Sequence, residues 1–169
     1  MMTERKRLSL APVGPGTIAR NKEDWRVRIH PHPPAAKVKK LLAACKLPGT
    51  DLEDEHLAHF FGCGEQADPT GVVGVELYGK LGLLRSLAVD QAARRHGCGK
   101  RLVKEAEQYA AGRGVQSLYL LTTTAEGFFA AIGYRRVDRA QVPAAIRDTQ
   151  EFSSLCPSSS SVMVKDLAG

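Results

Sequence analysis

The stretch LLRSLAVDQAARRHGCGKRL, Leu83 to Leu102, decides the fold that we expect for this chain. Its first part, through Val89, is almost entirely apolar, which is typical of a buried β-strand. Polar residues follow, and then Arg94, Gly97 and Gly99 stand at the spacing R-x-x-G-x-G. The sequence therefore predicts a strand, a short turn, a basic loop with two glycines, and the start of a helix.

The start of this helix is suited to an anion. The first N–H groups of a helix have no partner within the helix, and they carry the positive end of the helix dipole. Glycines let a ligand approach this backbone without meeting a Cβ atom. Arg94, Arg95 and Lys100 add full positive charges. The arrangement is best suited to a phosphate or a diphosphate.

Two other phosphate-binding motifs do not fit this loop. A dinucleotide-binding fingerprint requires a third glycine where this chain has Leu102. A P-loop requires glycine at the place of Arg94, and Ser or Thr at the place of Arg101. Both motifs are therefore excluded.

The composition predicts one α/β domain with a basic extension. The chain has 169 residues, enough to bury one core. Its formal net charge is +6, but residues 1–40 hold ten Lys or Arg and three acids, or +7, so the other 129 residues sum to −1. We expect a basic, disordered arm at residues 1–24 and a nearly neutral domain at residues 25–169. This balance argues against nucleic acid as a partner of the domain.

The chain also lacks the marks of a membrane or secreted protein. No stretch approaches the roughly 18 apolar residues of a membrane span. The first 17 residues have no apolar core of signal-peptide length. The four cysteines show no paired metal-type spacing, so we expect reduced thiols, no metal and a cytoplasmic location.

The hydrophobic patterns predict an alternation of strands and helices along the domain. The expected strands are 25–29, a short one within 61–68, 72–77, 81–89, 117–121, 134–137 and 162–164. The expected helices are 35–45, 51–60 (capped by Asp51), 97–111, 126–132 (capped by Thr123 or Thr124) and 142–149.

Together with the later FF-x-x-IGY segment, Phe128 to Tyr134, the opening stretch resembles the GCN5-related N-acetyltransferase (GNAT) superfamily. The resemblance implies a single α/β domain of the α+β kind, with a mixed, mostly antiparallel central sheet flanked by helices. It implies that the sheet splays between its fourth and fifth strands. It also implies acetyl-CoA as co-substrate and direct transfer of the acetyl group to an amine, without an enzyme nucleophile.

The same resemblance implies how the co-substrate is held. Main-chain groups of Leu87, Ala88 and Val89 would bond the pantetheine arm, and Val89 would bind the thioester oxygen. Thr122 and Phe128 would contact the co-substrate from the far side of the gap. The pyrophosphate would be held by the loop residues Arg94, Arg95, His96, Gly97, Cys98, Gly99 and Lys100.

Three positions depart from the superfamily pattern. Leu83 stands where some members place a glutamate base, and Thr122 where many have Asn. Phe129 stands where a Tyr often protonates the departing thiolate, and it has no hydroxyl. A water, Tyr119, Tyr134 or a threonine at 122–124 could supply that proton, and the sequence leaves this choice open.

For catalysis and acceptor binding, the candidates lie near the strand of the opening stretch. Glu76 is a candidate base, with a plain cross-strand ion pair to Arg85 as the alternative. A buried Arg85 needs a partner, either Glu76 or a substrate carboxylate. Ser86 could donate a hydrogen bond to the thioester, with simple packing as its alternative. Further candidates for acceptor contacts are Tyr78, Glu55, His56 and Thr123.

Two further patterns bear on a metal site and on a closer family. His56, His59 and Cys63 follow one another at helical spacing, but no fourth ligand is evident. The stretches LLRSLAV, LYLLTTTAEGFF and EFSSLCPSS look like the arsenic-resistance N-acetyltransferase branch. That likeness implies a small-molecule amine as acceptor, by analogy an arsenic-containing amino acid resembling glutamate.

Other functions stay open at this point. The acceptor could be a protein or peptide N-terminus. The chain could be a CoA-binding module without catalysis, or a metalloid sensor using Cys45, Cys63 or Cys156. Dimers are frequent in the superfamily, which makes a homodimer a candidate assembly.

Overall fold

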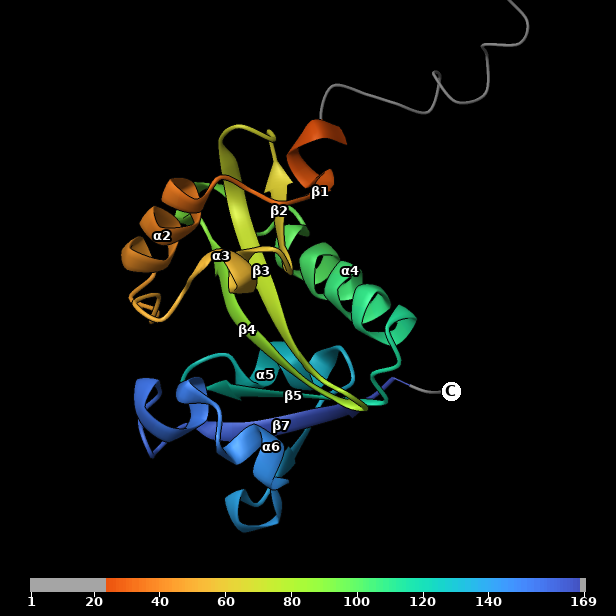
Figure 1. The fold of residues 1–169 in the computed structure, drawn as a ribbon. Helices are drawn as coiled ribbons and strands as arrows, with labels where there is room; N and C mark the ends of the chain where they lie inside the picture. Colours follow the sequence, from red (N-terminus) through yellow and green to blue (C-terminus); the bar gives the residue numbers. More distant parts are fainter. Residues whose placement is uncertain (1–23, 168–169) are drawn as a thin grey trace, which may run out of the picture.

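A computed structural model of the chain describes residues 24–167. These residues form one α/β domain around a seven-stranded sheet in the order β1-β2-β3-β4-β5-β7-β6 (Figure 1). Every neighbouring pair is antiparallel except β4 and β5, which are parallel. The expected fold class is therefore confirmed. The expectation of a disordered arm at residues 1–24 falls almost entirely outside the described residues.

The elements follow the hydrophobic patterns closely from residue 60 onward. The strands are β1 (Ile29–Pro31), β2 (Phe60–Gly64), β3 (Pro69–Tyr78), β4 (Leu81–Val89), β5 (Ser117–Thr122), β6 (Arg135–Val137) and β7 (Ser161–Asp166). The α-helices are α2 (Ala35–Ala44), α3 (Asp54–Leu57), α4 (Cys98–Gly112), α5 (Glu126–Ala131) and α6 (Ala144–Arg147). Short 3-10 turns lie at η1 (Asp24–Val27), η2 (Gln91–Ala93) and η3 (Arg139–Gln141), and η4 (Glu151–Leu155) is a π-helical turn.

Helices cover both faces of the sheet because its central strands are apolar on both sides. On one face, α4 packs Leu102, Val103 and Ala106 against the core that includes Val73. On the other face, α2 packs Val38 and other residues against a second cluster that includes Val72, the neighbour of Val73 in β3. Figure 1 shows α2 and α4 on either side of β3 and β4.

Three local expectations were wrong. Residues Asp24–Val27 form a 3-10 turn, so the first strand begins only at Ile29. The second helix is a single turn, α3, because Glu53 and His56 form a capping box that starts it late. Asp51 therefore caps nothing. Before α5, the hydroxyl of Thr122 accepts the N–H of Ala125 at 3.0 Å, in place of the caps expected from Thr123 or Thr124.

The central strand pair carries the features that shape the site. β4 pairs with β3 from Leu81 to Val89, but the register shifts at Ser86, which has a φ of 60°. A positive φ is unusual for a residue with a Cβ, and here it marks a β-bulge. The parallel pairing of β4 with β5 ends at Leu83 and Tyr119. The two strands then diverge, which confirms the splayed sheet.

All four cysteines are free thiols. Across residues 24–167, no helix combines the length and the apolar character needed to cross a membrane.

Candidate active site

A cavity of about 1140 Å³ opens where β4 and β5 part. Its walls are β4 from Leu84 to Val89, β5 from Leu120 to Thr122, the start of α4, and the loop after α2. Residues of the segment between Glu151 and Ser160 also line it. The volume suits a ligand larger than a typical drug-sized molecule. The cavity thus lies at the place where the sequence predicted the co-substrate.

The main chain of β4 offers its polar groups to this cavity at alternate residues. The N–H of Asp90 donates to Thr70 of β3 at 2.7 Å, and Ala88 is paired with Val72. Because strand groups alternate in direction, the groups of Ala88 also point toward β3, and those of Val89 point into the gap. The expectation that Ala88 bonds the pantetheine through its main chain is therefore corrected.

Arg94 lines the cavity, and its side chain also bonds to neighbouring residues of the protein. Its Nε donates to the carbonyl oxygen of Val89 at 3.0 Å, and its Nη2 lies 3.8 Å from Cys45 Sγ. This guanidinium therefore ties the loop back to the end of β4. The carbonyl oxygen of Val89 also accepts from Cys45 Sγ at 3.7 Å, and the N–H of Val89 is the group that can donate to a ligand oxygen.

The start of α4 has the form of an anion site. Gly97 has a φ of 86°, a left-handed conformation in which glycine is favoured, and no side chain caps the helix. The N–H of Arg101 bonds to the oxygen of Gly97 at 3.1 Å, so the earlier N–H groups of the turn remain for a ligand. The cavity lining here includes Arg95, Gly97, Cys98, Gly99 and Lys100.

Two residues of the loop do not reach the cavity with their side chains. Cys98 is 2% exposed, and a Cβ on Gly71 would lie 2.6 Å from its Sγ, so its thiol packs into the core. His96 is exposed and is not part of the cavity lining. Cys98 can therefore contribute only its main chain, and the expected contact from His96 is corrected.

On the β5 side, the threonines and one aromatic residue face the cavity. Thr122, Thr123, Thr124 and Phe128 all line it. Phe128 is 38% exposed and stacks edge-on against Phe129, which is buried. The ligand contacts expected from Thr122, Thr123 and Phe128 stay predictions.

Neither tyrosine proposed as an acid lines the cavity. Tyr119 points to the opposite face of β5, where it packs against the cluster of Leu83 and Ile146. Tyr134 is 3% exposed, and its hydroxyl donates to Glu107 at 2.9 Å. Burial and this carboxylate raise the pKa of Tyr134. The role of Tyr119 as catalytic acid is corrected, and the threonines remain.

Arg85 is the centre of a buried charge cluster. Its side chain is 0% exposed and faces three carboxylates, of Asp51, Glu76 and Glu151. Nη2 and Nη1 both donate to Asp51, the former at 2.8 Å; Nη1 also donates to Glu76 at 2.8 Å. Nε donates to Ser86 Oγ at 2.9 Å. The expected ion pair with Glu76 is confirmed, whereas contact with a substrate carboxylate is corrected because no part of the guanidinium is exposed.

Ser86 lines the cavity from the bulge of β4. It is 8% exposed and accepts the hydrogen bond from Arg85, so its hydroxyl hydrogen is still able to donate. Its role as a donor to the thioester stays a prediction.

Glu76 lies outside the cavity, together with the acceptor candidates on β3 and α3. Glu76 accepts bonds from Tyr78 and Arg85, and both it and Tyr78 are absent from the cavity lining. Glu55 is exposed on α3 and does not line the cavity. The structure thus places Glu76, Tyr78 and Glu55 outside the lining of this cavity, and their expected contacts stay predictions that the cavity does not support.

The histidines do not meet Cys63 at one centre. His59 Nδ1 bonds to the hydroxyl of Tyr109, and Cys63 Sγ donates to the carbonyl of Arg26. His56 Nδ1 accepts the N–H of Glu53 at 3.1 Å and lies outside the cavity, so its expected acceptor contact is corrected too.

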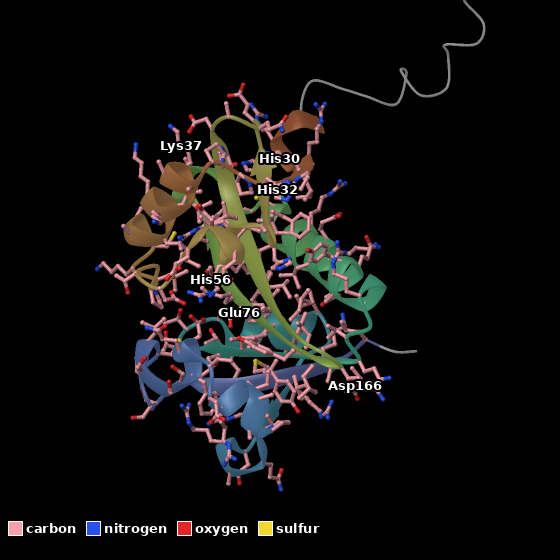
Figure 2. The ribbon with its side chains drawn as sticks, in the orientation of Figure 1. His30, His32, Lys37, His56, Glu76 and Asp166 are labelled. Atoms are coloured by element: carbon pink, nitrogen blue, oxygen red, sulfur yellow. The ribbon has the colours of Figure 1, made fainter. Side chains whose placement is uncertain are left out.

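Figure 2 shows His56 near Glu76, and ligand atoms of these two residues and of Asp51 lie within 4.8 Å of one another. The carboxylates of Asp51 and Glu76 are already bonded to Arg85. A cation at this place would therefore compete with the guanidinium.

The sequence did not single out Asp51 or Glu151 as site residues. Glu151 is 5% exposed, lines the cavity, and opens the distinctive stretch EFSSLCPSS. Burial and the carboxylates of Glu76 and Asp51 raise its pKa to about 7, although Arg85 opposes this rise. Only that stretch could have drawn attention to Glu151, because burial is not visible in the sequence.

Comparison with known proteins places the chain in a family. The family model of the acetyltransferase (GNAT) family matches residues 21–135 of this chain. The chain belongs to the acetyltransferase (GNAT) family. An uncharacterized N-acetyltransferase from Chlorobaculum tepidum is 32% identical over 115 residues, which cover 67% of this chain and 74% of that protein. This chain is thus an N-acetyltransferase by family.

Solved structures share the fold. N-acetylglutamate synthase from Neisseria gonorrhoeae, in complex with coenzyme A and L-arginine, has a TM-score of 0.70 at 20% identity over 84% of this chain. This chain spans only 33% of the length of that synthase. A Mycobacterium tuberculosis protein in complex with CoA and NLQ has a TM-score of 0.67 at 22% identity, covering 83% of this chain and 99% of its own.

Proposed function

We propose that this protein transfers the acetyl group of acetyl-CoA directly to the primary amine of a small molecule. The observation that carries the proposal is the cavity between β4 and β5, which runs from the uncapped start of α4 to the buried carboxylate of Glu151. One part of it suits a diphosphate and another suits an amine. Two of the structural relatives are complexes with coenzyme A, which supports the same co-substrate.

The start of α4 would hold the diphosphate. The N–H groups of Cys98, Gly99 and Lys100 have no acceptor inside the helix, and the helix dipole favours negative charge there. The side chains of Arg95 and Lys100 add two positive charges at the rim of the cavity.

The end of β4 would hold the pantetheine and the thioester. The main-chain groups of Leu87 and Val89 face the gap that β5 leaves open. The N–H of Val89 would bond the thioester oxygen, which gains negative charge as the amine attacks. Ser86 would add a hydroxyl donor beside it. A threonine at 122–124, or a water between them, would protonate the departing thiolate.

The small-molecule acceptor is favoured by the burial of residues that line the cavity near Glu151. Several residues between Glu151 and Ser160 line the cavity, and Glu151 and Ser160 themselves are buried. A peptide N-terminus, the rival acceptor, needs an open groove for the chain that follows it.

An arsenic-containing amino acid is our candidate acceptor within this class, through the likeness of three stretches to the arsenic-resistance branch. Since Arg85 is bonded to carboxylates of the protein itself, the acid groups of such a substrate would bind elsewhere.

The test is the release of CoA thiol from acetyl-CoA in the presence of a panel of amines. The panel contains putrescine, tyramine, glutamate, an arsenic-containing amino acid and a short peptide. Turnover with a small amine, and none with the peptide, supports the proposal. Tight binding of CoA without turnover of any amine would instead favour the non-catalytic module, and turnover of the peptide alone would favour the rival acceptor.

A further inference from the structure

The polar atoms around Glu151 are not all satisfied. Among residues 24–167, the buried side-chain atoms without a hydrogen-bond partner include Glu151 Oε1 and Ser160 Oγ, and both residues line the cavity. Arg85 Nη2 lies 3.3 Å from Glu151 Oε1, but its hydrogen bonds go to Asp51. A buried polar atom without a partner costs about 1–3 kcal/mol. Two such atoms on one cavity wall indicate that a ligand completes them.

The charges around Glu151 indicate what kind of ligand the site would bind. One guanidinium, Arg85, faces the carboxylates of Asp51, Glu76 and Glu151. If all three carboxylates are ionised, the cluster therefore carries two negative charges in excess, in a region that is shielded from water. A proton on Glu151 relieves this excess, and so does a cation in the cavity. Of the three carboxylates, only Glu151 lines the cavity, so a cationic ligand would meet this one.

The nearest titratable neighbour of Glu151 on its own turn is Cys156, whose thiol is hydrogen-bonded to the Glu151 side chain. Cys156, at the end of η4, also lines the cavity, and burial together with Glu151 raises the pKa of its thiol to about 12. This thiol therefore stays neutral beside the carboxylate. The π-helical turn that begins at Glu151 is a rare geometry that is frequent at functional sites.

We infer that Glu151 is the general base that receives the proton of a cationic acceptor amine, and that Ser160 Oγ holds the same amine by a hydrogen bond. This inference rests on the proposed function and names its substrate class, an ammonium group at neutral pH. An N–H bond of the ammonium breaks, and an O–H bond forms on Glu151. The freed lone pair then forms the C–N bond to the acetyl carbon.

The remaining steps release the CoA thiol and complete the amide. The C–S bond breaks, and its electron pair leaves with the sulfur. The nitrogen loses one further proton as the amide forms, and the thiolate gains one. The net products are the amide, the CoA thiol, and the proton that Glu151 passes to solvent. A base with a pKa of about 7 is half ionised near neutral pH, where proton transfer is most effective.

The experiment compares kcat/KM for the best amine of the panel against pH in the wild type and in Glu151→Gln. We expect the wild-type value to fall below pH 7, as Glu151 becomes protonated. We expect Glu151→Gln to lose about 10²-fold or more and to lose this limb of the profile, with CoA affinity changed less than two-fold. Ser160→Ala should raise the KM for the amine more than it lowers kcat.

The control is Glu126→Gln, a half-exposed carboxylate on α5 outside the cavity, which should keep both the rate and the profile. Glu151→Gln with kcat/KM within three-fold of the wild type and the same acidic limb would overturn the inference and leave the proposed function intact. A wild type that binds CoA but acetylates no amine would refute the proposed function, and the inference with it.

Discussion

Replacement of Arg85 by Met tests whether this residue is a structural centre or a substrate contact. The variant keeps most of the side-chain volume and removes the positive charge. Asp51, whose side chain is 3% exposed, then loses both of its bonds to the guanidinium, and Glu76 loses one. The carboxylates of Asp51, Glu76 and Glu151 would then lie together without the counter-charge of Arg85.

The expected loss of stability is large. Removal of one partner of a buried ion pair costs about 3–5 kcal/mol, because the remaining charge is left uncompensated. The matched control is Arg135→Met, since Arg135 pairs with Asp166 at 3.6 Å and both side chains are more than 60% exposed. A surface pair of this kind contributes at most about 1 kcal/mol. The two substitutions make the same chemical change in buried and exposed surroundings.

Urea unfolding at pH 7.5 and 25 °C measures both free energies. We expect Arg85→Met to lose at least three times as much as Arg135→Met, and part of the loss to return when Asp51→Asn is added. If Arg85→Met does not fold, Arg85→Lys takes its place. This variant keeps a charge but loses the forked geometry of the guanidinium. Its free energy of unfolding should lie below that of the wild type, by less than the loss expected for Arg85→Met. Equal losses in Arg85→Met and Arg135→Met, with a higher KM for the amine in the first, would refute the structural role.

Three further predictions concern single residues. Burial raises the pKa of Glu151 from its ordinary 4.5 to about 7, so the stability that this residue contributes is present below pH 4.5 and is lost as the pH rises to 7. Between pH 4 and pH 8, the free energy of unfolding of Glu151→Gln should therefore rise by about 3 kcal/mol relative to that of the wild type. Urea titrations at the two pH values measure this difference. Gly71→Ala should lower the thermal midpoint by several degrees, because the new Cβ would lie 2.6 Å from Cys98 Sγ, whereas Gly112→Ala meets nothing within 4 Å and should not. Tyr134→Phe should cost about 1 kcal/mol through its lost hydrogen bond to α4 and leave kcat unchanged, since it lies outside the cavity.

The sequence predicted the parts of the site whose signals are local. The apolar run of β4, the glycines at 97 and 99 and the helix that follows lie within twenty residues, and each has a pattern of its own. The splayed sheet followed from the family resemblance that these patterns support. The end of β4, the start of α4 and Phe128 therefore lie where we expected them.

The predictions that were wrong, and the site residues that were missed, depend on contacts between residues far apart in the sequence. Asp51 looks like a helix cap because Asp is favoured at that place, but its partner Arg85 is 34 residues away. Glu151 becomes a candidate base only through its burial beside Arg85, which no local pattern reveals. Tyr119 was misplaced because the sequence does not say which face of β5 turns toward the cavity.

The central claim is that a diphosphate binds the N–H groups at the start of α4, and calorimetry of CoA with Gly99→Asp tests it most directly. A carboxylate in the first turn suits the helix dipole, and a Cβ at Gly99 lies 3.6 Å from Phe128, so the fold should be kept while the anion is repelled. The matched control is Gly127→Asp, in the first turn of α5, where a Cβ meets nothing within 4 Å. We predict that CoA affinity falls at least ten-fold in Gly99→Asp and stays within two-fold of the wild type in Gly127→Asp. Equal CoA affinity in both variants and the wild type, or no CoA binding by the wild type, would contradict the claim.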